Sequence, residues 1–285
     1  MNAESLECTA PKARWNKRQK TLAVILVCLV LLLTLTIWGN LLGEKDMPVR
    51  FSQKGLRPSL AHPFGTDWFG RDMFLRTVKG LSLSIFIGMI ASLSSGIIAV
   101  VLGVSAALGG RKVDALIGWL TDVFMGMPHF IFLLLISFVA GKGAKGIVIG
   151  IILTHWTHIS RVIRAEVLQI RSSQYVQAAR GFGKSGWFIA KNHMLPHIMP
   201  QFLVGLILMF PHAILHEASL TFLGFGLSPH QPGIGVILSE SLNYLSTGQW
   251  WIALMPGLSL LGIVRLFDVL GEHVGALIDP KRANE

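Results

Sequence analysis

Six long apolar runs dominate this sequence and leave it few possible folds. About 20 apolar residues in a helix cross the hydrocarbon core of a bilayer, and backbone polar groups inside that core must be paired within the chain. Helices meet this need, whereas the many short alternating strands of a membrane barrel are absent from the sequence. We therefore expect an all-α integral membrane protein with six transmembrane helices. The predicted spans are residues 21–42, 81–108, 115–140 with an interruption at Pro128, 147–163, 201–216 and 250–270.

The composition agrees with this expectation. Of the 285 residues, 52% are hydrophobic and 14% charged, whereas a soluble domain carries about 25% charged residues. The net charge of +10 is explained by cytoplasmic loops, which retain Lys and Arg, so we expect membrane lipid as the environment and no nucleic acid as a partner. The first run is longer than the 7–15 residues of a signal-peptide core and is interpreted as a retained span.

The distribution of basic residues predicts the orientation. With the N-terminus inside, the predicted inner segments hold sixteen of the 25 Lys and Arg residues, and the outer segments hold nine, seven of them between Lys45 and Lys79. Cytoplasmic loops carry the excess of positive charge. We therefore expect both termini to lie in the cytoplasm.

A polar, basic segment separates the fourth and fifth predicted spans. Ser173 and Gln174 are suited to begin a short helix, and the small residues Ala178 and Ala179 would let another surface approach it closely. Glycines at 181 and 183 are predicted to end this helix. Leu195-Pro196 is predicted to end a second one, because proline cannot continue the helical hydrogen bonds.

Two further motifs flank predicted spans. The first is Gly65-Thr66-Asp67-x2-Gly70-Arg71-Asp72, ahead of the second span. There we expect Asp67 or Asp72 to cap a helix and Arg71 to pair with a carboxylate. The second is Phe222-Leu223-Gly224-Phe225-Gly226, after the fifth span, where Gly224 and Gly226 permit a tight outer turn.

Ionisable residues inside spans are candidates for function because burying them in lipid is costly. His212 and His216 share one helix face at a spacing of four residues, so they either touch a passing metal or bond to neighbouring carbonyls; both interpretations stay open. Arg265 and Asp268 are placed to pair on one helix face. The pore candidates are His155, His158, His212, His216 and Glu217.

The segment between the fourth and fifth spans resembles the cytoplasmic coupling loop of ABC importer permeases, although Gln177 stands where that family has Glu and His193 where it has Ile. The glycine-rich motif before the second span resembles the C-type permease of dipeptide, oligopeptide and nickel importers. The resemblance implies the type I ABC importer permease fold in a bacterial inner membrane. The residues implied to couple to the ATPases are Tyr175, Gln177, Ala178, Ala179, Gly183, Leu195 and Pro196.

The resemblance also implies a domain organisation and a set of partners. Residues 1–20 form a cytoplasmic tail, 21–80 the first span and an extracytoplasmic region, 81–274 the permease core with its coupling loop at about 171–200, and 275–285 a second cytoplasmic tail. The implied partners are a second permease subunit, two ABC ATPase subunits that bind ATP and Mg, and an extracytoplasmic substrate-binding protein. The chain itself is expected to bind no cofactor and to catalyse no reaction.

The substrate is predicted from fewer residues. Ten histidines, several near predicted pore helices, favour nickel or another transition metal or metal chelate, because neutral imidazole suits Ni, Cu and Zn. His212 and His216 are the predicted transient metal ligands. A di- or oligopeptide importer is the alternative. A secondary transporter driven by an ion gradient is a different class; it would need midplane carboxylates and inverted repeats, and no repeat is visible in the sequence.

Overall fold

The computed structural model describes residues 16–278, and within this range the chain is helical apart from its connections. Five helices are long and apolar enough to cross a membrane, and the bent pair α3–α4 makes a sixth candidate span. The helices are α1 (Lys17–Leu41), α2 (Met73–Leu108), α3 (Gly110–Gly126), α4 (His129–Val139), α5 (Gly143–Arg171), α6 (Gln174–Gly181), α7 (Gly186–Ile189), α8 (Leu195–Phe222), α9 (Ile234–Leu245) and α10 (Trp251–Ile278).

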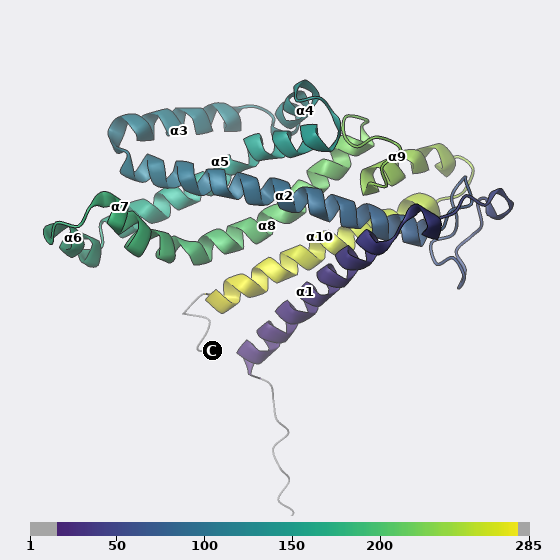
Figure 1. Ribbon diagram of the computed structural model, residues 1–285, viewed down its shortest axis with the longest axis horizontal. Helices are drawn as coiled ribbons and strands as arrows, with labels where there is room; N and C mark the ends of the chain where they lie inside the picture. The colour runs from purple at the N-terminus through teal and green to yellow at the C-terminus, as the bar shows by residue number, and fades with distance from the viewer. Residues whose placement is uncertain (1–15, 279–285) are drawn as a thin grey trace, which may run out of the picture.

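Helix α2 is the centre of the bundle, and it packs against α1, α5, α8 and α9. Helices α1 and α10 lie beside each other along one side, and α3 and α4 cover another (Figure 1). The N-terminal end of α1 and the C-terminal end of α10 point away from the end of the molecule that carries α9 and residues 42–72 (Figure 1). Helices α6 and α7 also lie away from α9, where α5 ends and α8 begins (Figure 1). The two motifs flanking predicted spans and the polar segment therefore occupy opposite ends of the molecule.

Small residues let the helices approach closely. A Cβ atom added at Gly146 of α5 would lie 2.5 Å from the carbonyl oxygen of Ser137 in α4, and one at Gly150 would lie 3.1 Å from the Leu133 side chain. Gly271 of α10 makes a similar approach to Leu208 of α8. The spacing of glycines at both places therefore marks a close-packed helix face, as in other membrane helices.

The predicted third span is broken more sharply than expected. Helices α3 and α4 meet at an angle of 98°, with Met127 in an extended conformation (φ −91°, ψ 146°) just before Pro128. A residue that precedes proline is pushed out of the helical region, and proline lacks the amide that would continue the helix. Pro128 therefore turns the chain, and α4 lies across the end of α5 instead of extending α3.

The prediction that Leu195-Pro196 ends a helix was wrong. Residues Gly186–Phe222 form one continuous helical stretch, in which Ala190–Met194 is a π-helical turn and Pro196 lies in the first turn of α8. The wider π turn precedes the proline, and the first turn of a helix tolerates a missing amide. The chain therefore passes from the polar segment into the fifth span without a break.

Two other predictions change with the structure, one on an ion pair and one on the lengths of the spans. Arg265 lies 3.5 Å from Glu272, two turns along α10, instead of pairing with Asp268. The predicted spans were also too short at several ends: α2 begins at Met73, α5 continues to Arg171 and α10 to Ile278. Residues 1–15 and 279–285 of the two predicted cytoplasmic tails lie outside the described residues.

Candidate functional site

The Gly65–Asp72 motif forms the predicted cap and ion pairs. Asp72 accepts hydrogen bonds from the amides of Phe74 and Leu75 at the start of α2, and His62 Nδ1 lies 2.7 Å from its second oxygen. Asp67 Oδ2 accepts from Arg71 Nε at 2.7 Å and from Arg76 Nη1 at 2.8 Å. These contacts fix the loop before α2.

The same network reaches across the molecule to α9. Arg76 is 6% exposed, and its Nη2 donates to Glu240 Oε2 at 2.9 Å. Glu240 also helps raise the pKa of Tyr244 above its usual range, after the larger effect of partial burial of the phenol. Asp67, Arg71, Arg76 and Glu240 line a small cavity of about 240 Å³. Because Asp67 and Glu240 are each paired with an arginine, the geometry of the network is that of a structural tie between the loop, α2 and α9.

Backbone conformation and close packing explain the glycines of the Gly65–Asp72 motif and of the Phe222–Gly226 motif. Gly65 and Gly70 both have φ +72°, and a Cβ at Gly70 would lie 1.8 Å from the carbonyl oxygen of Arg50. Gly224 has φ +82°. Gly226 instead packs so closely on Thr221 that a Cβ would lie 2.1 Å from its hydroxyl oxygen. The predicted tight turn after α8 is therefore confirmed.

The polar segment presents an exposed surface held to the core by a few buried side chains. Val176 of α6 and Ile189 of α7 are buried, and both pack with Met194 in the core around α5 and α8. Large apolar side chains nearby point outward: Tyr175 is 46% exposed, Phe182 84% and Trp187 79%. Large exposed apolar side chains are typical of surfaces that contact a partner or a membrane.

The predicted coupling residues are spread over this surface. Gln177, Ala178, Gly183 and Pro196 are exposed, whereas Ala179 and Leu195 are partly buried against the core. Gly183 has φ +74° and permits the turn after α6. Ser173 occupies the position before α6, but its hydroxyl donates to the Ile170 carbonyl instead of capping the helix.

A cavity of about 580 Å³ lies between the α3–α4 junction, α5 and α8. It runs along α5 from Thr154 to Glu166 and along α8 from Ile198 to His216, a length of roughly 18–27 Å at about 1.5 Å per helical residue. Its volume is in the range of about 300–1,000 Å³ that is usual for small-molecule sites. The four predicted pore histidines all line it: His155, His158, His212 and His216.

Two expectations for this site need correction. Glu217 is fully buried and does not line the cavity. Its Oε1 accepts a hydrogen bond from Thr221 and lies 3.8 Å from the position of a Cβ at Gly233, so it faces the turn after α8. The predicted metal pair is also different: the histidines that approach one another are His129, His155 and His216, without His212.

His129 was not predicted, because the predicted pore histidines all lie in the fourth and fifth spans. It directly follows Pro128, and the 98° bend there turns its side chain toward α5 and α8. Its position inside the predicted third span, beside the proline, was the signal that could have identified it.

The fold and this site define a multi-pass membrane protein with a cavity between its helices. Solved structures titled as inward-facing conformations of the MetNI methionine ABC transporter share the fold: a native crystal form matches with a TM-score of 0.60 and 16% identity, and covers 73% of this chain and 98% of that one. A second crystal form gives a TM-score of 0.61. This likeness identifies the type I ABC importer permease fold.

Sequence comparison places the chain in a family. Residues 99–279 match the family described as binding-protein-dependent transport system inner membrane component, and the chain belongs to that family. It is 32% identical over 279 residues to the dipeptide transport system permease protein DppC of Bacillus subtilis, covering 97% of this chain and 87% of that protein. The probable D,D-dipeptide permease DdpC of Escherichia coli is 32% identical over 92% of this chain and 87% of its own length. The oligopeptide permease OppC of Bacillus subtilis is 30% identical over 93% and 87%.

The chain is thus an ABC importer permease that groups with dipeptide and oligopeptide permeases. It is a multi-pass inner membrane protein and the permease component of a transporter.

Proposed function

We propose that this chain is one of two permease subunits of an importer for di- or oligopeptides. The observation that supports this substrate best is the match to dipeptide and oligopeptide permeases along nearly the whole chain. The alternative weighed from the sequence therefore replaces the preference for nickel, which these relatives do not support. The partners are a second permease, two ABC ATPases that bind ATP and Mg, and an extracytoplasmic binding protein.

The cavity along α5 and α8 is this chain's proposed share of the translocation path. Five histidines, two threonines and Gln201 supply its polar lining, and Glu166 is the one acidic residue among the described residues that line it. A transport path must hold its cargo weakly enough to release it. A wall with hydrogen-bonding groups and little fixed charge meets that need for a peptide, whose two termini carry opposite charges.

The surface made by α6 and α7 is the proposed contact for the ATPases. It is joined directly to both helices that line the cavity: α6 follows α5 after Ser172 and Ser173, and α7 continues through the π turn into α8. The stretch Gly186–Phe222 has 37 residues, about 55 Å of helix. A displacement of the surface by ATPase closure is therefore transmitted along α8 to the cavity wall.

The orientation proposed from the basic residues fits this arrangement. It places α6, α7 and both chain termini in the cytoplasm, and it places α9 and the Gly65–Asp72 network on the outer side, where the binding protein docks.

The test is uptake by cells that carry the whole complex, with and without this chain. We expect accumulation of a radiolabelled dipeptide to depend on the chain and on ATP, and unlabelled dipeptide to compete with it. Accumulation of radiolabelled nickel with no uptake of any labelled dipeptide or oligopeptide would contradict the proposal.

A further inference from the structure

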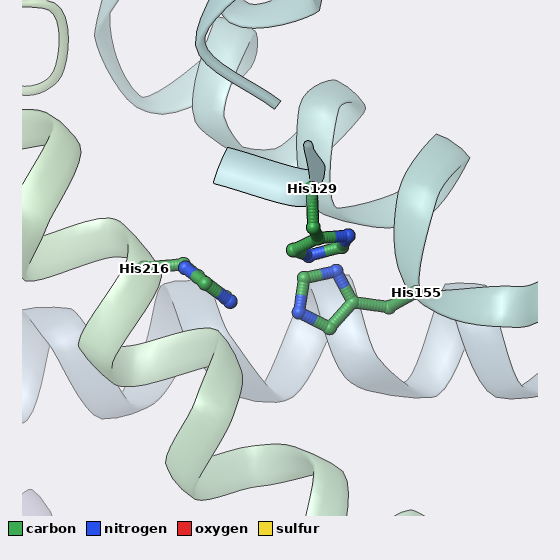
Figure 2. Close-up of side chains that lie close together, drawn as sticks. All are labelled: His129, His155 and His216. Atoms are coloured by element: carbon green, nitrogen blue, oxygen red, sulfur yellow. The ribbon is translucent and has the colours of Figure 1, made fainter. Parts of the chain in front are cut away.

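Three histidines from three different helices meet at one end of the cavity. His129 comes from the first residue of α4, His155 from α5 and His216 from α8 (Figure 2). Their ring centroids form a nearly equilateral triangle with sides of 4.9, 5.1 and 5.1 Å. One ring nitrogen of each lies within 4.8 Å of those of the other two.

This geometry is close to that of a metal centre with three imidazole ligands. Bonds of about 2.0–2.1 Å at tetrahedral angles hold the nitrogens about 3.4 Å apart. Each nitrogen reaches that spacing from 4.8 Å by moving less than about 1 Å toward the centre, which is within the reach of side-chain rotation.

The hydrogen bonds of His155 set the tautomer that a metal requires. The Thr154 hydroxyl donates its one proton to the Gly150 carbonyl at 2.9 Å. Its oxygen can therefore only accept a hydrogen bond from His155 Nδ1, which lies 3.0 Å away. Nδ1 therefore carries the ring proton, and Nε2 is left with a free lone pair. Metal-binding histidines are held in the same way by a bond from the second ring nitrogen.

The free nitrogen has no partner in the described part of the chain. His155 Nε2 is buried without a hydrogen bond, a condition that native proteins rarely leave uncompensated. His129 is exposed and lines the cavity, so the site can be reached from it. The described residues that line the cavity include neither Lys nor Arg, so no fixed positive charge there repels a cation.

We propose that His129, His155 and His216 form a binding site for one divalent transition-metal ion of the kind that imidazole prefers, such as Zn²⁺, Ni²⁺ or Cu²⁺. Three protein ligands leave a coordination position open toward the cavity, for water or for a donor atom of a passing ligand. The ion links α4 to α5 and α8. The site depends on these three rings and not on which cargo the importer carries.

Zinc is the probe for the test. The full complex, purified with a histidine-free tag and reconstituted in lipid nanodiscs, is titrated with Zn²⁺ in competition with a chromogenic chelator. We expect one tight site per copy of this chain. Changing a second-shell partner of a metal ligand weakens binding by roughly 10–100-fold, so His129→Gln, His155→Gln and His216→Gln should each weaken it by at least about 100-fold.

Two sets of control variants separate this site from general binding by histidines. His158→Gln and His212→Gln remove rings that line the same cavity outside the triangle, and we expect less than about a twofold change. Thr154→Val should weaken binding by roughly 10-fold because His155 loses its orienting bond, whereas Thr154→Ser should retain it. Gel filtration confirms that each complex is assembled.

An equal affinity for Zn²⁺ in the parent and in the variant with all three histidines changed to Gln would overturn the proposal. A loss of affinity in His212→Gln as large as in the three single variants would also overturn it. If cells with the parent complex take up no dipeptide but the purified parent complex still binds zinc, the peptide function is refuted and the metal site is not.

Discussion

Two arginines of the Gly65–Asp72 network bind the same carboxylate oxygen but differ in burial. This difference allows the contribution of each to the free energy of unfolding to be predicted. Arg71 and Arg76 lie 2.7 and 2.8 Å from Asp67 Oδ2, and their side chains are 25% and 7% exposed. Breaking a buried pair costs about 3–5 kcal/mol because a charge stays buried without its partner. A pair whose arginine is more open to solvent contributes less, toward the about 0–1 kcal/mol of an exposed pair.

We expect Arg76→Met to lower the free energy of unfolding by about 3 kcal/mol, the lower end of that range because Asp67 keeps Arg71 and two backbone amides. Arg71→Met, the matched control, should cost about 1 kcal/mol or less. The difference of about 2 kcal/mol is a factor of about 30 in the equilibrium constant.

The measurement is equilibrium unfolding of the purified protein in mixed micelles, followed by circular dichroism for the parent and both variants. Methionine retains much of the apolar stem of arginine, so the packing around the stem is largely kept. If Arg71→Met destabilises the protein as much as Arg76→Met, burial does not govern the network and the reasoning is wrong.

Three other predictions concern different parts of the chain. Ala178→Asp on the exposed face of α6 should abolish uptake while the protein still inserts, because a charged side chain obstructs ATPase docking; near-normal uptake with the ATPase bound would sink this assignment. A reporter fused after Asp279 should be active only in the cytoplasm and one placed near Asn243 only outside, and an external signal from the first would reverse the topology. Gly70→Ala should lower the thermal midpoint, because a Cβ there meets a carbonyl oxygen 1.8 Å away in addition to the roughly 1–2 kcal/mol of a left-handed backbone. Gly183→Ala, at a similar φ but with open space around the added Cβ, should lower the thermal midpoint less, because it carries only the roughly 1–2 kcal/mol of the left-handed backbone.

Features encoded by residues close together in the sequence were predictable. Asp67, Arg71 and Asp72 lie within six positions, so their cap and ion pair follow from local geometry. The six apolar runs likewise predicted the spans, because the membrane requires helices of that length. The family could be recognised from motifs of the same local kind.

Features that depend on the packing of distant segments were not predictable. The partner of Arg76 on α9 is 164 positions away, and His129 meets His155 and His216 only because α4 turns back across α5. The role of Pro196 was misjudged because a π turn before it admits the proline without ending the helix. Glu217 was a reasonable pore candidate by residue type, but the packing of α8 turns it away from the cavity.

The central claim, that the cavity along α5 and α8 is the path of a peptide, is tested most directly by filling the cavity. Gly205 lines it, and a Cβ there comes no closer than 3.8 Å to Ile159, so Gly205→Trp places a large ring in the cavity without a backbone clash. Gly262→Trp, on the exposed face of α10 with no atom within 4 Å, is the control. The measurement is uptake of a radiolabelled dipeptide by cells that carry each assembled complex. The account predicts loss of uptake in Gly205→Trp and near-parental uptake in Gly262→Trp, whereas equal uptake in both would contradict it.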